Sequence, residues 1–242
     1  MAGETGSAAR THEPRGLGAA FAAYGLWGLF PLYFNMLTKA GSAEIVAHRV
    51  AWTLVFCVLA VTLTGGWGRV RTAWRDRRLV GRLALAGVFV SVNWLLYVFA
   101  VLTGHVVDAA LGYFINPLVT VVLAVVVQRE RLRPTQIWAL GVGLAAVVVI
   151  VIGYGQFPWL GFGLAVTFGL YALVKSRVGQ TVGPLVGIGF EAATTAPLAI
   201  AYIAVLELVG QGSFVSQGPG YTAALAGTGV VTAVPLLFFA YG

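Results

Sequence analysis

Ionisable side chains interrupt several long apolar segments of this sequence, where an uncompensated charge is costly. The segment AEIVAHR contains Glu44, His48 and Arg49, and the first two are one helical turn apart on one face. A histidine changes its protonation state near neutral pH. Two interpretations have equal support: the residues line a cavity as a charged cluster, or they form an interfacial ion pair that anchors the end of the helix.

An amide and a phenol share a helix face further along the chain. Asn93 and Tyr97 are four residues apart, and Trp94 lies beside them. Such a face suits the binding of a planar or polar solute. Hydrogen bonding that only holds neighbouring helices together is equally well supported.

A polar stripe follows in the segment DAALGYFINPLVTVVLAVVVQRE. Asp108, Gly112 and Asn116 recur every four residues and therefore lie on one helix face. Pro117 removes a backbone donor beside Asn116 and is expected to kink the helix. An aqueous pathway requires a polar stripe of this kind, and we favour a pathway over a purely adhesive role.

Glu191 lies about one-third of the way along another apolar segment. An ionisable group at such a depth is a functional-site hypothesis by default, and we expect a carboxylate that takes up and releases protons. Prolines within the apolar segments mark expected helix bends, at Pro31, Pro117, Pro197 and Pro235.

Motifs of enzymes and metal sites are missing from the sequence. The single cysteine, Cys57, cannot form an intrachain disulfide, and no Cys/His cluster has metal-ligand spacing. There is no Gly-rich phosphate loop and no His-Glu-x-x-His motif. We therefore expect no metal, no cofactor and no catalytic residues, and neither an ATP-driven pump nor a membrane hydrolase is supported.

The elements that position these residues are predicted to be membrane-spanning helices, giving an all-α polytopic membrane protein. Hydrophobic residues make up 59% of the chain and charged residues 10%, whereas soluble domains carry about 25% charged residues. Apolar runs recur with about the 20 residues that cross a bilayer as helix. Eight such runs are expected, at 16–37, 44–64, 83–103, 106–127, 134–153, 158–175, 183–210 and 220–242.

The basic residues predict how these helices are oriented. If the spans alternate in direction, 13 of the 15 Lys and Arg residues fall on one side, in the tail and in short loops. This asymmetry is typical of membrane topology rather than of nucleic-acid binding, and it predicts a cytoplasmic amino terminus. Residues 1–15 are small, polar and charged, and are predicted to form a disordered cytoplasmic tail.

Four segments in order resemble the RarD branch of the EamA-type drug/metabolite transporters. They are GLWGLFPLYF, AEIVAHRVAWTL, SVNWLLYVFAV and ALGYFINPLVTVVLAVVVQRERL, and the resemblance covers nearly all of the chain after the tail. It implies a secondary transporter of ten helices in two inverted five-helix repeats. Residues 16–153 would form the first repeat and 158–242 the second, truncated after three helices because the last two of the expected ten are absent.

The resemblance implies a permease or exporter that moves small metabolites or drug-like solutes across the plasma (inner) membrane by alternating access. Its partners would be a small solute, the lipid bilayer and protons. The alternatives are a membrane scaffold or enzyme without transport, or a truncated transporter that does not function. The expected lining of the pathway comprises His48, Arg49, Asn93, Tyr97, Asp108, Asn116 and Glu191.

Overall fold

Helices form all the regular structure in the described part of the chain. The structure is a computed structural model that describes residues 13–129, 131–178 and 181–241. Its elements are α1 (Glu13–Gly28), α2 (Phe30–Asn35), α3 (Ser42–Leu63), α4 (Trp67–Arg75), α5 (Arg77–Leu102), α6 (Val106–Gln128), α7 (Pro134–Tyr154), α8 (Trp159–Val178), α9 (Pro184–Leu208) and α10 (Pro219–Tyr241). Seven of these, α3 and α5 to α10, are long and apolar enough to cross a membrane, which confirms an all-α polytopic membrane fold.

The first predicted span is two helices rather than one. α1 and α2 are separated at Leu29, two residues before Pro31. Pro31 has no N–H to donate to the carbonyl of Trp27, so a continuous helix would lose a hydrogen bond there. α1 begins at Glu13, inside the predicted tail, whose residues 1–12 lie outside the described part of the chain.

The basic loop after the second span contains a helix that was not predicted. In α4, Ala73 is buried while Arg69 and Arg71 are exposed, so the helix lies with one face against the bundle. Asp76 ends α4 and begins α5, because its carboxylate accepts hydrogen bonds from the backbone N–H groups of Arg78 and Leu79 at 3.0 and 3.1 Å.

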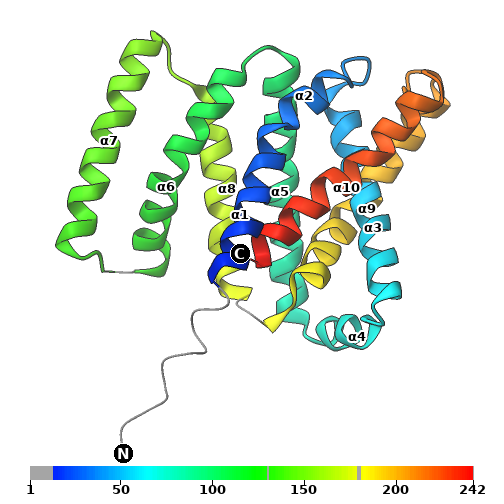
Figure 1. The fold of residues 1–242 in the computed structure, drawn as a ribbon, viewed down its shortest axis with the longest axis horizontal. Coiled ribbons are helices and arrows are strands. Elements are labelled where there is room, and N and C mark those ends of the chain that lie inside the picture. The colour runs from blue at the N-terminus through cyan, green and yellow to red at the C-terminus, as the bar shows by residue number, and fades with distance from the viewer. Residues whose placement is uncertain (1–12, 130, 179–180, 242) are drawn as a thin grey trace, which may run out of the picture.

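The long helices alternate in direction, so successive loops lie at opposite ends of the bundle (Figure 1). The lower end in this view carries α4, the loop from α6 to α7 and the end of α8. The described basic residues outside the spans gather at this end, and Lys39 lies at the other. The alternation on which the charge argument depends is therefore present in the fold.

Close approaches between helices occur where a glycine faces the backbone of a neighbour. A Cβ on Gly112 would lie 2.7 Å from the carbonyl oxygen of Gly161, which brings α6 and α8 together. Gly87 in α5 faces the backbone of Glu191 in α9 in the same way, and Gly229 in α10 faces that of Trp52 in α3. The helix pairs in contact include α1–α10, α3–α9, α3–α10, α5–α8, α5–α9 and α6–α8.

At the end of the bundle opposite α4, hydrogen bonds join residues 33–40 to residues 221–224. The Tyr33 hydroxyl donates to the carbonyl of Ala224 at 2.5 Å, and the Tyr221 hydroxyl donates to the carbonyl of Leu37 at 2.9 Å. The backbone N–H of Ala40 donates to the Tyr221 hydroxyl at 2.8 Å. These bonds tie α10 to α2 and to the turn that follows it.

α7 stands apart from the rest of the bundle. It packs against α6 at the edge of the molecule (Figure 1), and none of its residues is buried. Its sequence is apolar on all sides, as expected of a helix surrounded by lipid.

Candidate functional site

A buried guanidinium enclosed by aromatic rings lies between α2, α3 and α5. Arg49 is only 3% exposed. Its Cζ lies 4.2 Å from the ring centroid of Trp94, and 5.4 and 5.3 Å from those of Phe30 and Phe34. The negative faces of aromatic rings stabilise a cation at these distances. We call these four residues the Arg49 cage.

Only some of the hydrogen-bond donors of Arg49 have a partner among the described residues. Its Nε donates to Thr232 Oγ1 in α10 at 2.6 Å, whereas its Nη1 has no hydrogen-bond partner in the described chain. No described carboxylate forms an ion pair with it. Tyr97 packs against Phe34 of the cage, with ring centroids 6.3 Å apart. The cage therefore holds a buried positive charge that the described residues leave uncompensated.

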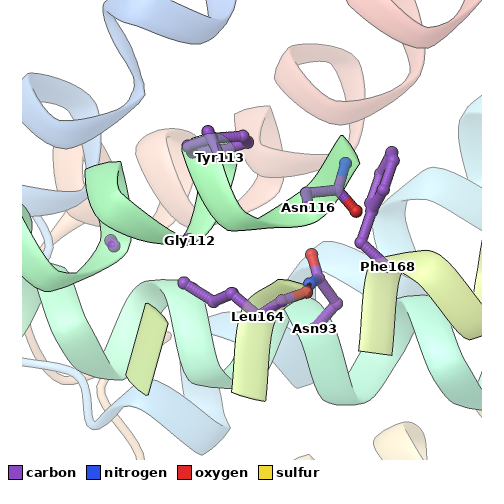
Figure 2. Close-up of a pocket in the computed structure, with 7 residues that line it drawn as sticks. Asn93, Gly112, Tyr113, Asn116, Leu164 and Phe168 are labelled. Atoms are coloured by element: carbon purple, nitrogen blue, oxygen red, sulfur yellow. Dashed lines mark hydrogen bonds between the residues drawn. The ribbon is translucent and has the colours of Figure 1, made fainter. Parts of the chain in front are cut away.

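A small cavity that is open to the surroundings lies between α5, α6 and α8. Figure 2 shows Asn93 and Asn116 extending toward this space from α5 and α6. Its lining comprises Asn93, Ala109, Gly112, Tyr113, Asn116, Leu164 and Phe168. It has room for about one water molecule, about 10 Å³, far less than the roughly 300–1,000 Å³ of pockets that enclose drug-sized ligands.

Asn93 also holds two helices together. Its Nδ2 donates to the carbonyl of Leu164 at 2.9 Å and to Thr167 Oγ1 at 3.0 Å, both in α8. Interhelical hydrogen bonding by this residue is therefore observed at the wall of the cavity, whereas its contact with a solute stays a prediction.

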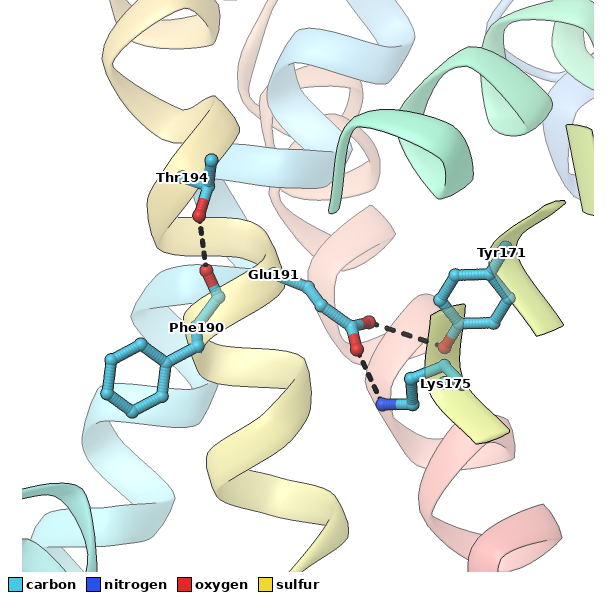
Figure 3. A network of polar contacts seen from close by, with 5 residues as sticks. All are labelled: Tyr171, Lys175, Phe190, Glu191 and Thr194. Carbon is cyan, nitrogen blue, oxygen red and sulfur yellow. Dashed lines mark hydrogen bonds and ion pairs between the residues drawn. The ribbon is translucent and has the colours of Figure 1, made fainter. Parts of the chain in front are cut away.

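Glu191 belongs to a separate polar network between α8 and α9 (Figure 3). Its Oε1 forms a 2.5 Å ion pair with Lys175 Nζ, and its Oε2 accepts a 3.3 Å hydrogen bond from the Tyr171 hydroxyl. Tyr171 and Lys175 are four residues apart on α8, so both reach the same carboxylate. Glu191 is 5% exposed, and the side chain of Lys175 is 31% exposed.

The predicted Glu44, His48 and Arg49 cluster is divided among three environments. Glu44 pairs with no cation in the described ranges: its Oε1 accepts from the backbone N–H of Ser213 at 2.6 Å and its Oε2 from the Ser213 hydroxyl at 3.1 Å. His48 stacks on Phe214, with ring centroids 4.7 Å apart, and neither ring nitrogen has a hydrogen-bond partner among the described residues. An ion pair that anchors the helix end is thus not formed.

Asp108 is buried in the first turn of α6, where the helix dipole favours a negative charge. Its Oδ1 has no hydrogen-bond partner within the described residues, and its backbone carbonyl faces Gly161 of α8. The predicted stripe of Asp108, Gly112 and Asn116 therefore turns toward α8 and serves both close packing and the cavity wall.

Comparison with known proteins identifies the family of this chain. Residues 14–152 match the family model described as the EamA-like transporter family, and the match covers more than half of the chain. The chain belongs to the EamA-like transporter family. Because members of this family are transporters, the membership decides against the membrane enzyme considered from the sequence.

Individual relatives of this EamA-like chain include two proteins named RarD. It is 43% identical to protein RarD of Streptomyces exfoliatus over 96% of the chain and 73% of that protein. It is 34% identical to protein RarD of Escherichia coli K12, covering 93% of the chain and 75% of that protein. The transporter YojE of Bacillus subtilis is 36% identical over 90% and 72% of the two chains. No solved structure matches the chain.

The predicted lining residues of the EamA-like chain do not form one continuous surface. Asn93 and Asn116 meet at the cavity, and Tyr97 lies near Arg49. Glu191 lies in its own network, and His48 lies under Phe214. Tyr113 lines the cavity together with Asn93 and Asn116. The described residues contain no group of three His, Cys, Asp or Glu side chains that could hold a metal ion.

Several partners in these networks were missed from the sequence. Lys175 lies one helical turn after Tyr171 at the end of a predicted span, and this spacing was the available signal. The ring of Phe214 and the hydroxyl of Thr232 carried no signal, because both come from regions distant in sequence from their partners. The bends predicted at Pro117, Pro197 and Pro235 fall inside continuous helices and stay predictions.

Proposed function

We propose that this chain moves small metabolites or drug-like solutes across the plasma membrane as a secondary active transporter that works by alternating access. The observation that carries the proposal is the set of buried polar groups without partners in the described chain. They are the Arg49 Nη1, both ring nitrogens of His48, the Thr53 Oγ1 and the Asp108 Oδ1. Such groups are expensive in a hydrocarbon environment, and a path for water and solute gives them a function.

The pattern of helix contacts supports two inverted repeats. Inverted repeats would pair α1 with α8, α3 with α9, and α5 with α10. Under this pairing, the contact between α5 and α8 corresponds to the contact between α10 and α1, and that between α5 and α9 corresponds to that between α10 and α3. All four contacts are present. The closely approaching Gly87 and Gly229 occupy α5 and α10, which this exchange relates. We therefore retain 16–153 and 158–242 as the proposed repeats, with a solute site between them.

A cytoplasmic amino terminus is part of the proposal. It rests on the basic residues that gather at the end of the bundle carrying α4. Glu191, near this end, is the proposed proton-coupling carboxylate. Its pairing with Lys175 supports such a role, because release of the pair and uptake of a proton can be linked.

Flux across reconstituted membranes tests the proposal. Proteoliposomes that contain the chain are loaded with a panel of small solutes, and efflux is followed with and without a pH gradient. We expect accelerated flux of at least one solute that depends on the gradient, and loss of that dependence in Glu191→Gln. If no solute in the panel moves faster than through protein-free liposomes, the transport proposal is wrong.

Access of water to the cavity gives a second test. In a Cys57→Ser background, Asn116→Cys is treated with a water-soluble thiol reagent in membranes, and Val142→Cys is the matched control. Val142 is 67% exposed on α7 and should face lipid. We expect Asn116→Cys to react and Val142→Cys to remain unmodified. Equal protection of both positions would favour a scaffold without an aqueous pathway.

A further inference from the structure

The Arg49 cage is built as a binding site that lacks its negative partner. Arg49 is only 3% exposed, and its Nη1 has no hydrogen-bond partner in the described chain. Among the described residues, its single hydrogen bond to a side chain is to the neutral hydroxyl of Thr232. We propose that the Arg49 cage binds the carboxylate of an amphipathic organic acid, which is the class of solute that the chain carries.

The geometry of a guanidinium favours a carboxylate as the partner. Its N–H donors form a rigid planar fork, and a carboxylate matches two of them with its two oxygens. Nε is already used by Thr232, so the donors that remain are those at the Nη end of the fork. One monovalent anion there neutralises the one buried cation. A phosphate dianion would leave an uncompensated negative charge, because no second cation lies in the cage.

The walls of the cage indicate what the carboxylate is attached to. Trp94, Phe30 and Phe34 present ring carbon around the guanidinium, so an apolar or aromatic group next to the carboxylate would lie against apolar surface. A small, strongly hydrated anion would lose its water without gaining such contacts. The site therefore selects acids with an apolar body.

The cage and the cavity of Figure 2 are neighbours along α5, because Trp94 of the cage directly follows Asn93 of the cavity lining. Tyr97, one turn further along α5, packs against Phe34 of the cage with ring centroids 6.3 Å apart, while Asn93 and Asn116 supply polar groups to the cavity. A solute whose carboxylate lies at Arg49 can extend toward these amides. This inference rests on the proposed transport function for its biological meaning, but binding can be measured without transport.

Calorimetric titration of the full chain in lipid nanodiscs tests the inference. The probes are phenylacetate, the isosteric phenylacetamide, phenethylammonium and inorganic phosphate. The variants are Arg49→Lys, which keeps the charge and loses the planar fork, and Arg82→Gln as a matched control. Arg82 is exposed on α5 and donates to the carbonyl of Arg177, far from the cage in sequence.

We expect saturable binding of phenylacetate and binding of the amide and the ammonium ion weaker by about tenfold or more. Loss of the charge-assisted fork in Arg49→Lys should weaken phenylacetate binding by about ten- to a hundredfold, with Arg82→Gln unchanged. The comparison of probes on the unmodified chain holds even if Arg49→Lys does not fold.

Three results would overturn the inference: no binding of phenylacetate, equal binding of acid and amide, or binding of inorganic phosphate as tight as that of phenylacetate. Its failure is distinguishable from failure of the transport proposal. Binding of the acid without any solute flux removes transport and leaves the site. Flux of neutral or cationic solutes alone, without binding of the acid, removes the site and leaves transport.

Discussion

At the residue scale, the ion pair between Lys175 and Glu191 is unequal in its burial. Glu191 is 5% exposed, whereas the Lys175 side chain is 31% exposed and can regain water if its partner is removed. Removing either partner therefore has different consequences, because a buried carboxylate without its cation keeps an uncompensated charge.

Lys175→Met should destabilise the chain by about 2 kcal/mol, less than the roughly 3–5 kcal/mol of a fully buried pair because Lys175 is partly exposed. Glu191→Met should cost less, and the double variant should recover much of the loss. Thermal unfolding in detergent measures this, with about 2–4 °C in Tm for each kcal/mol at this chain length. Equal Tm values for Lys175→Met and the double variant would contradict the expectation.

Sequence reasoning located the buried charges but not their surroundings. Arg49 and Glu191 could be identified because a charged residue inside an apolar segment stands out in the sequence alone. The Arg49 cage could not, because its rings come from two other helices and aromatic residues are common in membrane spans. The division of Glu44 from Arg49 also needed the structure, since Ser213 lies in a loop distant in sequence.

At the scale of helices, close packing depends on a few glycines among the 32 in the chain. The lengths and limits of the spans were predictable from apolar runs, within a few residues for most. The glycines at the closest approaches, Gly87 and Gly229, could not be distinguished from the others, because any glycine in a span permits contact and only the neighbour decides whether it is used.

Gly87→Ala should destabilise the α5–α9 contact by about 1–3 kcal/mol, because the added Cβ would overlap the backbone of Glu191 and force the helices apart. Gly81→Ala is the matched control on the same helix, where a Cβ meets open space and should be neutral or slightly stabilising. Thermal unfolding of both variants in the same detergent decides. A Gly87→Ala protein as stable as Gly81→Ala would show that the contact is loose.

At the scale of the whole molecule, the alternating helices and the asymmetric charges together predict the orientation in the membrane. In a Cys57→Ser background, Thr72→Cys on α4 and Lys39→Cys in the opposite loop are each exposed. A membrane-impermeant maleimide applied to intact spheroplasts should label Lys39→Cys and label Thr72→Cys only after permeabilisation. The reverse pattern would invert the proposed topology.

The hydrogen bonds at the end of the bundle opposite α4 should affect how often that end opens. The bonds of Glu44 with Ser213, and those of Tyr33 and Tyr221, join the two parts of the chain at this end, so under the proposed alternating access they would favour a state closed on that side. Glu44→Ala removes the hydrogen bonds to Ser213, which should stabilise the closed state by about 1–2 kcal/mol. Their loss should raise the ratio of open to closed molecules by about five- to thirtyfold. Distances between spin labels at residues 39 and 215 would report this shift, and an unchanged distribution would place the pivot of any rocking motion at this end instead.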